Sequence, residues 1–320
     1  MNRIFILKML IFSILASPLS AQADYKAMAK IPLRTVWKKG DSYQYELTKG
    51  KINYLDGKED NRNEARQTVT LSVMESSSKG FIIEAEYNSA AYFLPDDLKS
   101  IKGINKLVEK YRQTKVQYAI SPNGEFKGIL NGRTIQKMLV DLFETIENSA
   151  IKNEITANVF ANMRCQMTSE VYITEGLFQE LRLLHQFYGN EYAPDAYQEY
   201  DTELANMLEP QGKPIPAKAS LKVSWLEDKY CLVEHTLVPN EAIMKKLTCD
   251  YFKKMTDGTT EVQNTSLREG ISLHVRDEGK YAFHQRSGWL VELYKTRTID
   301  FNDEKTVEFV KMTLLEKGSF

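Results

Sequence analysis

Histidines and carboxylates are the side chains in this sequence that could carry out acid–base or metal chemistry, and few of them fall together. His274 and His284 flank residues 277–280, the polar stretch Asp-Glu-Gly-Lys, which is typical of a turn. A hairpin at that turn would bring the two imidazoles together beside two carboxylates, as in a metal site. Paired histidines on a solvated sheet face are more often plain polar surface, so we predict no metal site.

The other two histidines belong to apolar patterns. His185 lies one position from the apolar stripe of an expected helix, which favours an ordinary residue at the helix boundary. His235 falls in the alternating row of Cys231 and Val233, so we expect a structural residue that needs a hydrogen-bond partner if it is buried. The alternative is a hydrolase that joins His235 or His274 to carboxylates distant in the sequence.

Known catalytic motifs are missing from the sequence. It contains no Gly-x-Ser-x-Gly elbow, no phosphate-binding Walker loop, no His-Glu-x-x-His and no Asp-rich calcium loop. Glu84 and Glu86 share one face of a strand, and nothing fixes the opposed carboxylate pair that glycoside hydrolysis requires. We therefore assign no catalytic, cofactor-binding or metal residues and no cofactor. Whether the chain is an enzyme stays open, with a non-enzymatic role favoured.

The periodicity of apolar residues predicts an α+β fold. Alternation at every second residue marks strands in residues 24–130 and 191–320, and the closing stretch Ile271–Glu316 predicts a meander of three or four strands. Asp56-Gly57 predicts a hairpin turn, and Asn240 predicts the N-cap of a short helix. Residues 131–190 carry the 3.6-residue period of helices, and we expect Leu139 and Leu142 to lie buried against the sheet. We predict antiparallel meanders that form a curved sheet or half-barrel, with the helical middle packed on it, as a single unit over 24–320.

The beginning of the chain predicts export. Residues 4–16 are mostly apolar, and Ala21-Gln22-Ala23 matches a leader cleavage pattern, which makes 1–23 a signal peptide cut before Asp24. The formal net charge of −1 argues against nucleic acid as a partner. No later stretch approaches the roughly 20 apolar residues of a membrane span. We expect a periplasmic or secreted protein with no transmembrane span in the mature chain.

The three cysteines, Cys165, Cys231 and Cys249, are too few for a disulfide scaffold. Cys231 and Cys249 are close enough in sequence for a bridge, but Cys231 alternates as a buried residue would. Cys249 lies off the apolar stripe of its expected helix. We predict three free thiols.

Several turns carry a resemblance to a known group of proteins. They are Ser121-Pro122-Asn123-Gly124, the stretch Gly212-Lys213-Pro214-Ile215-Pro216, and Gly288-Trp289 in the closing meander. With the leader and the amphipathic helix, they make the chain resemble a family of uncharacterised exported β-rich proteins of Gram-negative bacteria, a domain of unknown function. A more distant fold-level similarity is to the half-barrel of periplasmic lipoprotein carriers, in which a curved sheet wraps helices and offers an apolar groove.

The resemblance implies no catalytic residues and no established activity. Together with the aromatic-rich strands, it favours an exported, non-enzymatic binding or scaffold protein. The expected partner is an apolar or polymeric ligand or another envelope protein. The alternatives are the hydrolase described above and a structural subunit of an envelope assembly.

Overall fold

The computed structural model describes residues 30–88, 103–111, 114–150, 154–206, 208–209, 211–227, 229–255 and 272–318. The predicted leader and its cleavage before Asp24 lie outside these residues. That residues 24–320 form one unit stays a prediction.

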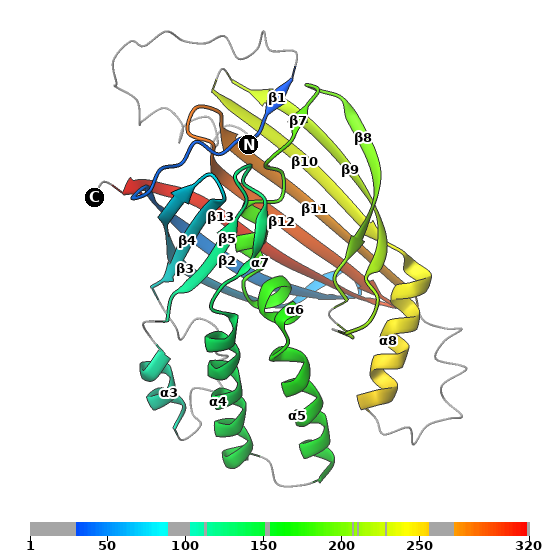
Figure 1. Cartoon of the computed structure of the whole chain (residues 1–320). Coiled ribbons are helices and arrows are strands. Elements are labelled where there is room, and N and C mark those ends of the chain that lie inside the picture. Colours follow the sequence, from blue (N-terminus) through cyan, green and yellow to red (C-terminus); the bar gives the residue numbers. More distant parts are fainter. Residues whose placement is uncertain are drawn as a thin grey trace.

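A curved antiparallel sheet of eleven strands dominates the molecule (Figure 1). Its order is β6-β5-β4-β3-β2-β13-β12-β11-β10-β9-β8, so neighbours in the sheet are consecutive strands everywhere except at β2 and β13, which pair although they are far apart in the sequence. The strands are β2 (Ser42–Leu55), β3 (Lys58–Ser77), β4 (Gly80–Tyr87), β5 (Val116–Ile120), β6 (Phe126–Ile129), β8 (Tyr197–Leu204), β9 (Ile215–Leu226), β10 (Tyr230–Pro239), β11 (Leu273–His284), β12 (Trp289–Phe301) and β13 (Glu304–Gly318).

The helices come from the middle of the chain, as predicted. They are α3 (Ile104–Tyr111), α4 (Gly132–Ala150), α5 (Glu154–Met167), α6 (Glu170–Tyr172), the π-helix η4 (Ile173–Leu177), α7 (Gln179–Leu184) and, later, α8 (Glu241–Met255). A two-stranded sheet joins β1 (Ile31–Pro32) to β7 (Glu191–Tyr192). The predicted fold class, antiparallel meanders in a curved, open sheet with a helical middle packed on it, is confirmed.

The core lies between the concave, inner face of the sheet and the segment 173–188. Leu181 and Tyr188 of this segment are almost fully buried in the same core cluster as Tyr45 of β2 and Tyr281 of β11. Figure 1 shows α6 and α7 inside the curve of the sheet, while α4 and α5 extend beyond one end of it. The concave face is therefore filled along this segment by the protein's own side chains.

Local signals placed one hairpin turn and one helix cap correctly. The predicted hairpin at Asp56-Gly57 joins β2 to β3, and both residues have positive φ, 51° and 74°. Two residues with positive φ form the turn whose twist matches a two-residue hairpin, and glycine makes that conformation inexpensive. Asn240, predicted as a helix cap, accepts a hydrogen bond from the backbone N–H of Ile243 at 3.1 Å.

The predicted turn at residues 277–280 is wrong. β11 runs through it without interruption, so the closing meander has three strands, β11, β12 and β13. Asp277 is 2% exposed because its side chain points inward to cationic partners. A Cβ atom on Gly279 would lie only 2.6 Å from the Tyr281 ring, so the ring needs a glycine at this position. Polar and glycine residues that are typical of a turn thus serve the interior of a strand.

The helix α4 behaves as predicted over its first half only. Leu139 is 6% exposed and belongs to the main core, as expected. Leu142 is half-buried and packs with Ile104 of α3, Ile146 of α4 and Phe160 of α5 instead of the sheet. The physical reason is length: the 19 residues of α4 carry its apolar stripe past the sheet edge, where the neighbouring helices cover it.

Candidate functional site

Charged side chains gather on the inner face of the sheet beside residues 175–182. Asp277 of β11 receives two hydrogen bonds from Arg297 of β12, from Nε at 2.7 Å and from Nη2 at 2.8 Å. Lys295 Nζ lies 2.7 Å from the same carboxylate. Burial alone would raise the pKa of Asp277, but the hydrogen bonds and charges of Arg297 and Lys295 outweigh it and lower the pKa to about 2. Burial lowers the pKa of Lys295, against the attraction of Asp277.

A second buried carboxylate ties the helical segment to the sheet. Glu180 of α7 is fully buried, and its Oε2 lies 2.6 Å from Lys49 Nζ of β2. The hydroxyl of Tyr87 donates to Glu180 Oε1 at 2.6 Å, and Lys49 Nζ also donates to the carbonyl of Leu177 at 2.7 Å. Arg182 Nε lies 2.7 Å from Glu175 Oε2 within the same segment. Both buried carboxylates, Asp277 and Glu180, are therefore neutralised by adjacent cations and hydrogen bonds, a structural arrangement.

The histidines do not form the constellation that the sequence offered. His274 and His284 occupy opposite ends of β11 because no turn separates them. His274 Nδ1 lies 3.1 Å from Glu241 Oε2, and His284 Nδ1 lies 2.9 Å from Ser287 Oγ. Over the described residues, no three histidines, cysteines or acids are grouped so that they could hold a metal ion.

The other two histidines are buried between helix and sheet. His235 is 6% exposed, and its Nε2 lies 3.2 Å from the Tyr200 hydroxyl, the partner that a buried imidazole needs. Burial and the charge of Lys295 lower its pKa to about 4. His185 is the C-cap of α7, at the helix boundary as expected, and it is buried; its Nε2 lies 3.1 Å from the Tyr118 hydroxyl, and burial lowers its pKa to about 3. Both imidazoles are neutral at pH 7 and packed among aromatic rings.

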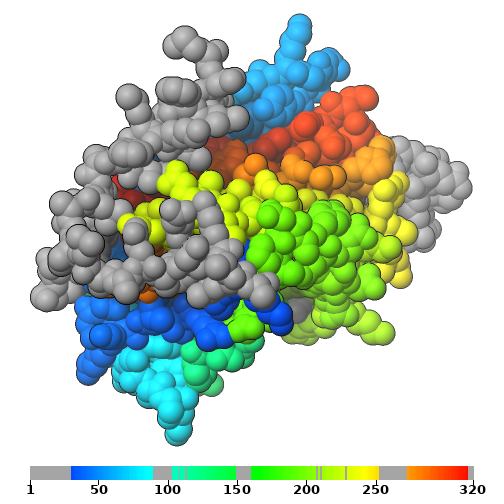
Figure 2. Space-filling view, turned by 90° about the horizontal axis from the view of Figure 1, so that it is seen from above, coloured from blue at the N-terminus to red at the C-terminus, as the bar shows by residue number. Residues whose placement is uncertain are grey.

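A pocket of about 420 Å³ lies at the other side of the sheet, over the strands β8 to β11. Figure 2 shows these strands following one another across the outer face, from green through yellow to orange. Side chains alternate between the two faces of a sheet, so the pocket is lined by the residues of each strand that point away from the core. Its outer-face lining is Tyr197, Glu199, Asp201, Lys218, Ser220, Thr236, Val238 and Arg276, with Tyr200 and Ala219 at its floor.

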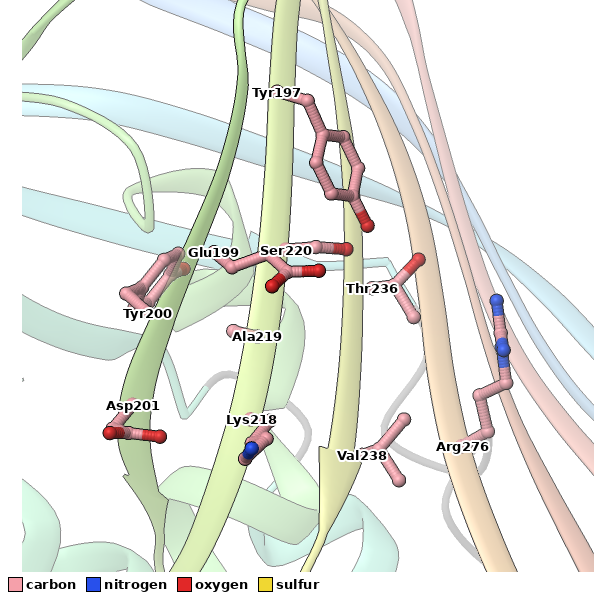
Figure 3. Close-up of a pocket in the computed structure, with 10 residues that line it drawn as sticks. All are labelled: Tyr197, Glu199, Tyr200, Asp201, Lys218, Ala219, Ser220, Thr236, Val238 and Arg276. Atoms are coloured by element: carbon pink, nitrogen blue, oxygen red, sulfur yellow. The ribbon is translucent and has the colours of Figure 1, made fainter.

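Three charged side chains of the pocket are without an ion pair among the described residues. Glu199, Asp201 and Lys218 are exposed and form no ion pair with any residue that the structure describes. Asp201 and Lys218 are opposite one another on β8 and β9, yet they remain apart. Figure 3 shows the Tyr197 side chain above the carboxylate of Glu199, and the side chain of Arg276 on the far wall. Two acids and two bases beside the half-buried hydroxyls of Ser220 and Thr236 make a recess whose charges nearly balance.

Sequence reasoning missed both groups of residues. Four of the inner charges, Lys49, Glu180, Lys295 and Arg297, fall in strand or helix patterns where a charge is typical of the surface. Asp277 falls in the predicted turn. A charged residue at an inward position of an otherwise apolar row is the one signal that could have exposed them, as at Asp277 between Val275 and Gly279. The pocket residues follow an ordinary polar face, and only the strand order brings them together.

All three cysteines are free, as predicted. Cys231 is buried, and its sulfur accepts a hydrogen bond from Gln285 Nε2 at 2.9 Å. Burial raises its pKa to about 12, which leaves the thiol protonated and unreactive at pH 7. Cys249 packs with Leu273.

Comparisons with known proteins give no family. No family model matches the chain, and neither does any curated protein. A structure of lipid–protein interactions in lipovitellin matches with a TM-score of 0.40 and 10% identity, over 88% of this chain and 26% of that one. The chain thus spans about a quarter of that lipovitellin chain. The outer membrane protein Omp33 of Acinetobacter baumannii matches with a TM-score of 0.16 and 9% identity, over 87% of this chain and 100% of that one.

Likenesses this distant say nothing about a ligand of this chain. Among the described residues, no helix is both long and apolar enough to cross a membrane.

Proposed function

We propose that this protein is an exported, non-enzymatic binding protein that holds a polar, polymeric ligand in the pocket over β8 to β11. The observation that carries the proposal is the set of exposed charges in the pocket, Glu199, Asp201 and Lys218, which have no partner among the described residues. Charges that a protein does not use internally are available to a ligand, and a recess of about 420 Å³ is within the usual size of ligand sites.

The character of the lining supports a polar ligand over the apolar one that the sequence also allowed. Hydroxyl groups from Ser220 and Thr236 belong to the lining beside the charges, and the exposed ring of Tyr197 offers a flat contact surface. The concave face, where an apolar groove was expected, is packed with the protein's own core along the segment 173–188. The polar recess on the outer face is therefore the better candidate.

The charged groups on the inner face support a role without catalysis. Asp277 and Glu180, the buried carboxylates, are held by cations, and His235 is held by Tyr200. A general base must be within reach of a substrate, and these three groups are buried and engaged in internal contacts.

Binding is tested with the mature chain and a panel of envelope polymers: peptidoglycan fragments, lipopolysaccharide core oligosaccharide and extended peptides. We expect one class to bind saturably in calorimetry and to be recovered with unchanged mass. The double variant Tyr197→Ala, Lys218→Ala should weaken that binding at least tenfold.

The matched control is Tyr294→Ala, Lys58→Ala, which removes an exposed tyrosine and an exposed lysine elsewhere on the sheet. Equal affinity of both double variants would remove the pocket from consideration. Cleavage of a bound polymer would contradict the binding-protein proposal and favour the hydrolase alternative.

A further inference from the structure

The two edges of the eleven-stranded sheet are unequal. β6, at one edge, has four residues, whereas β8, at the other, has eight. Within the described chain β8 pairs with β9 alone, so one row of its backbone N–H and C=O groups has no strand beside it. The first five residues of β8, Tyr-Gln-Glu-Tyr-Asp, are all exposed. An edge of this length is a template for another extended segment.

The side chains of β8 select what can pair with this edge. Glu199, Asp201 and Glu203 alternate with Tyr200 and Thr202, so the three acids point to the outer face on which the pocket lies. None of the three acids forms an ion pair with a described residue. β8 contains neither lysine nor proline, which commonly protect an exposed edge from pairing.

A second copy of this chain is a poor partner for β8. Antiparallel pairing of two β8 strands about Tyr200 would place Glu199 of one copy opposite Asp201 of the other, and in-register parallel pairing would place each acid beside its own equivalent. Like charges in directly opposed positions destabilise a sheet. The same three acids favour a strand that carries lysine or arginine at every second position.

We propose that β8 accepts an extended basic polypeptide as an additional antiparallel or parallel strand, with its cationic side chains opposite Glu199, Asp201 and Glu203. This inference rests on the proposed function and names the class of its ligand. Cross-strand neighbours on one face lie about 5 Å apart, within reach of an ion pair. The exposed ring of Tyr197, at the start of β8, supplies a face for a further cation.

The test uses hydrogen exchange, because strand addition protects backbone amides at a known place. The probe is an eight-residue peptide that alternates lysine with valine and threonine. A scrambled peptide with its lysines contiguous and a peptide with glutamate in place of lysine are the controls. We expect slower exchange over 197–204 only with the alternating peptide, and a loss of affinity between 50 and 300 mM salt, because exposed charges are screened.

The double variant Glu199→Lys, Asp201→Lys should lower the peptide affinity at least tenfold. Glu75→Lys, a reversal at an exposed acid of β3 without an ion pair among the described residues, should leave it unchanged. Circular dichroism spectra and thermal midpoints are measured to check that both variants fold. Equal binding of the scrambled peptide, or protection elsewhere than 197–204, overturns the inference.

The two proposals fail in different ways. If an oligosaccharide binds and Tyr197→Ala weakens it while the amides of β8 stay unprotected by peptide, the strand-addition inference is wrong and the pocket proposal stands. If neither class of polymer binds, both are wrong.

Discussion

Asp277 on the inner face of β11 and Asp201 on the outer face of β8 are both carboxylates in the middle of a strand. Asp277 is 3% exposed at its side chain and is held by Arg297 and Lys295, whereas Asp201 is exposed and leaves Lys218, its neighbour across the ladder, unpaired. The inner charges cost desolvation that only their partners offset, so they are fixed. The outer charges are already solvated, so they can exchange water for a ligand.

Burial and internal partners therefore separate the charges that stabilise the fold from those that are available to a ligand. The inner charges connect β2, β11, β12 and the helical segment, and removing one should be felt in stability. The outer charges connect nothing within the described protein, and removing one should be felt in binding. The following predictions test that contrast.

The largest effect is expected from Asp277→Ala. It leaves Arg297 and Lys295 mostly buried without their counter-charge, which should lower the free energy of unfolding by about 3–5 kcal/mol. Asp201→Ala is the matched control and should change it by less than about 0.5 kcal/mol. Urea denaturation of both variants gives the comparison, and two similar midpoints would mean that the inner charges are not structural.

The pH dependence of stability should come from the inner face as well. The pKa of His235 in the folded chain, about 4, lies below its ordinary value near 6.5, so the unfolded chain binds the proton more readily. Stability from this residue is complete above pH 6.5 and is lost as the pH falls toward 4, by on the order of 3 kcal/mol. His185 adds a loss of the same sign that extends toward pH 3.

Urea midpoints measured between pH 7 and pH 4 test this dependence. His235→Gln should flatten the curve, because it removes the group that takes up a proton on unfolding. A curve that is equally steep in His235→Gln contradicts the assignment.

A smaller effect is expected from Tyr87→Phe, which removes the hydroxyl that donates to the buried Glu180. A hydrogen bond to a charged group contributes about 1.5–3 kcal/mol, so the free energy of unfolding should fall by that amount. Tyr197→Phe removes a hydroxyl from the outer pocket and should leave the urea midpoint within error. An unchanged free energy of unfolding in Tyr87→Phe would show that Lys49 alone offsets the cost of burying Glu180.

The smallest effect on stability is expected from Lys218→Ala in the pocket. An exposed lysine without an ion pair contributes within about 0.5 kcal/mol, so the thermal midpoint should stay the same while affinity for a pocket ligand falls. Lys49→Ala sharpens the comparison, because it uncovers the buried charge of Glu180 and should lower the midpoint strongly. Equal thermal midpoints for the two lysine variants would contradict the claim that inner-face charges stabilise the fold and outer-face charges do not.

Sequence reasoning succeeded where a few consecutive residues carry the information. The hairpin at Asp56-Gly57 and the cap at Asn240 follow from backbone preferences of single residues. The burial of Leu139 follows from a helical period. It failed at residues 277–280, where Asp and Gly are typical of a turn, because the compensating partners Lys295 and Arg297 belong to another strand. It failed at Leu142 because a period indicates a buried face without indicating what covers it.

What the sequence by itself determined is local, namely alternating strands and a helical middle, since side-chain periods and turn residues act within a few positions. The tertiary structure decided which distant residues meet. It placed Tyr87 against Glu180, 93 positions away, and Lys49 against the same carboxylate. It also joined β2 to β13 and left β8 at an edge with its acids outward. Strand order and the burial of charge depend on contacts across the whole chain, and no local pattern encodes them.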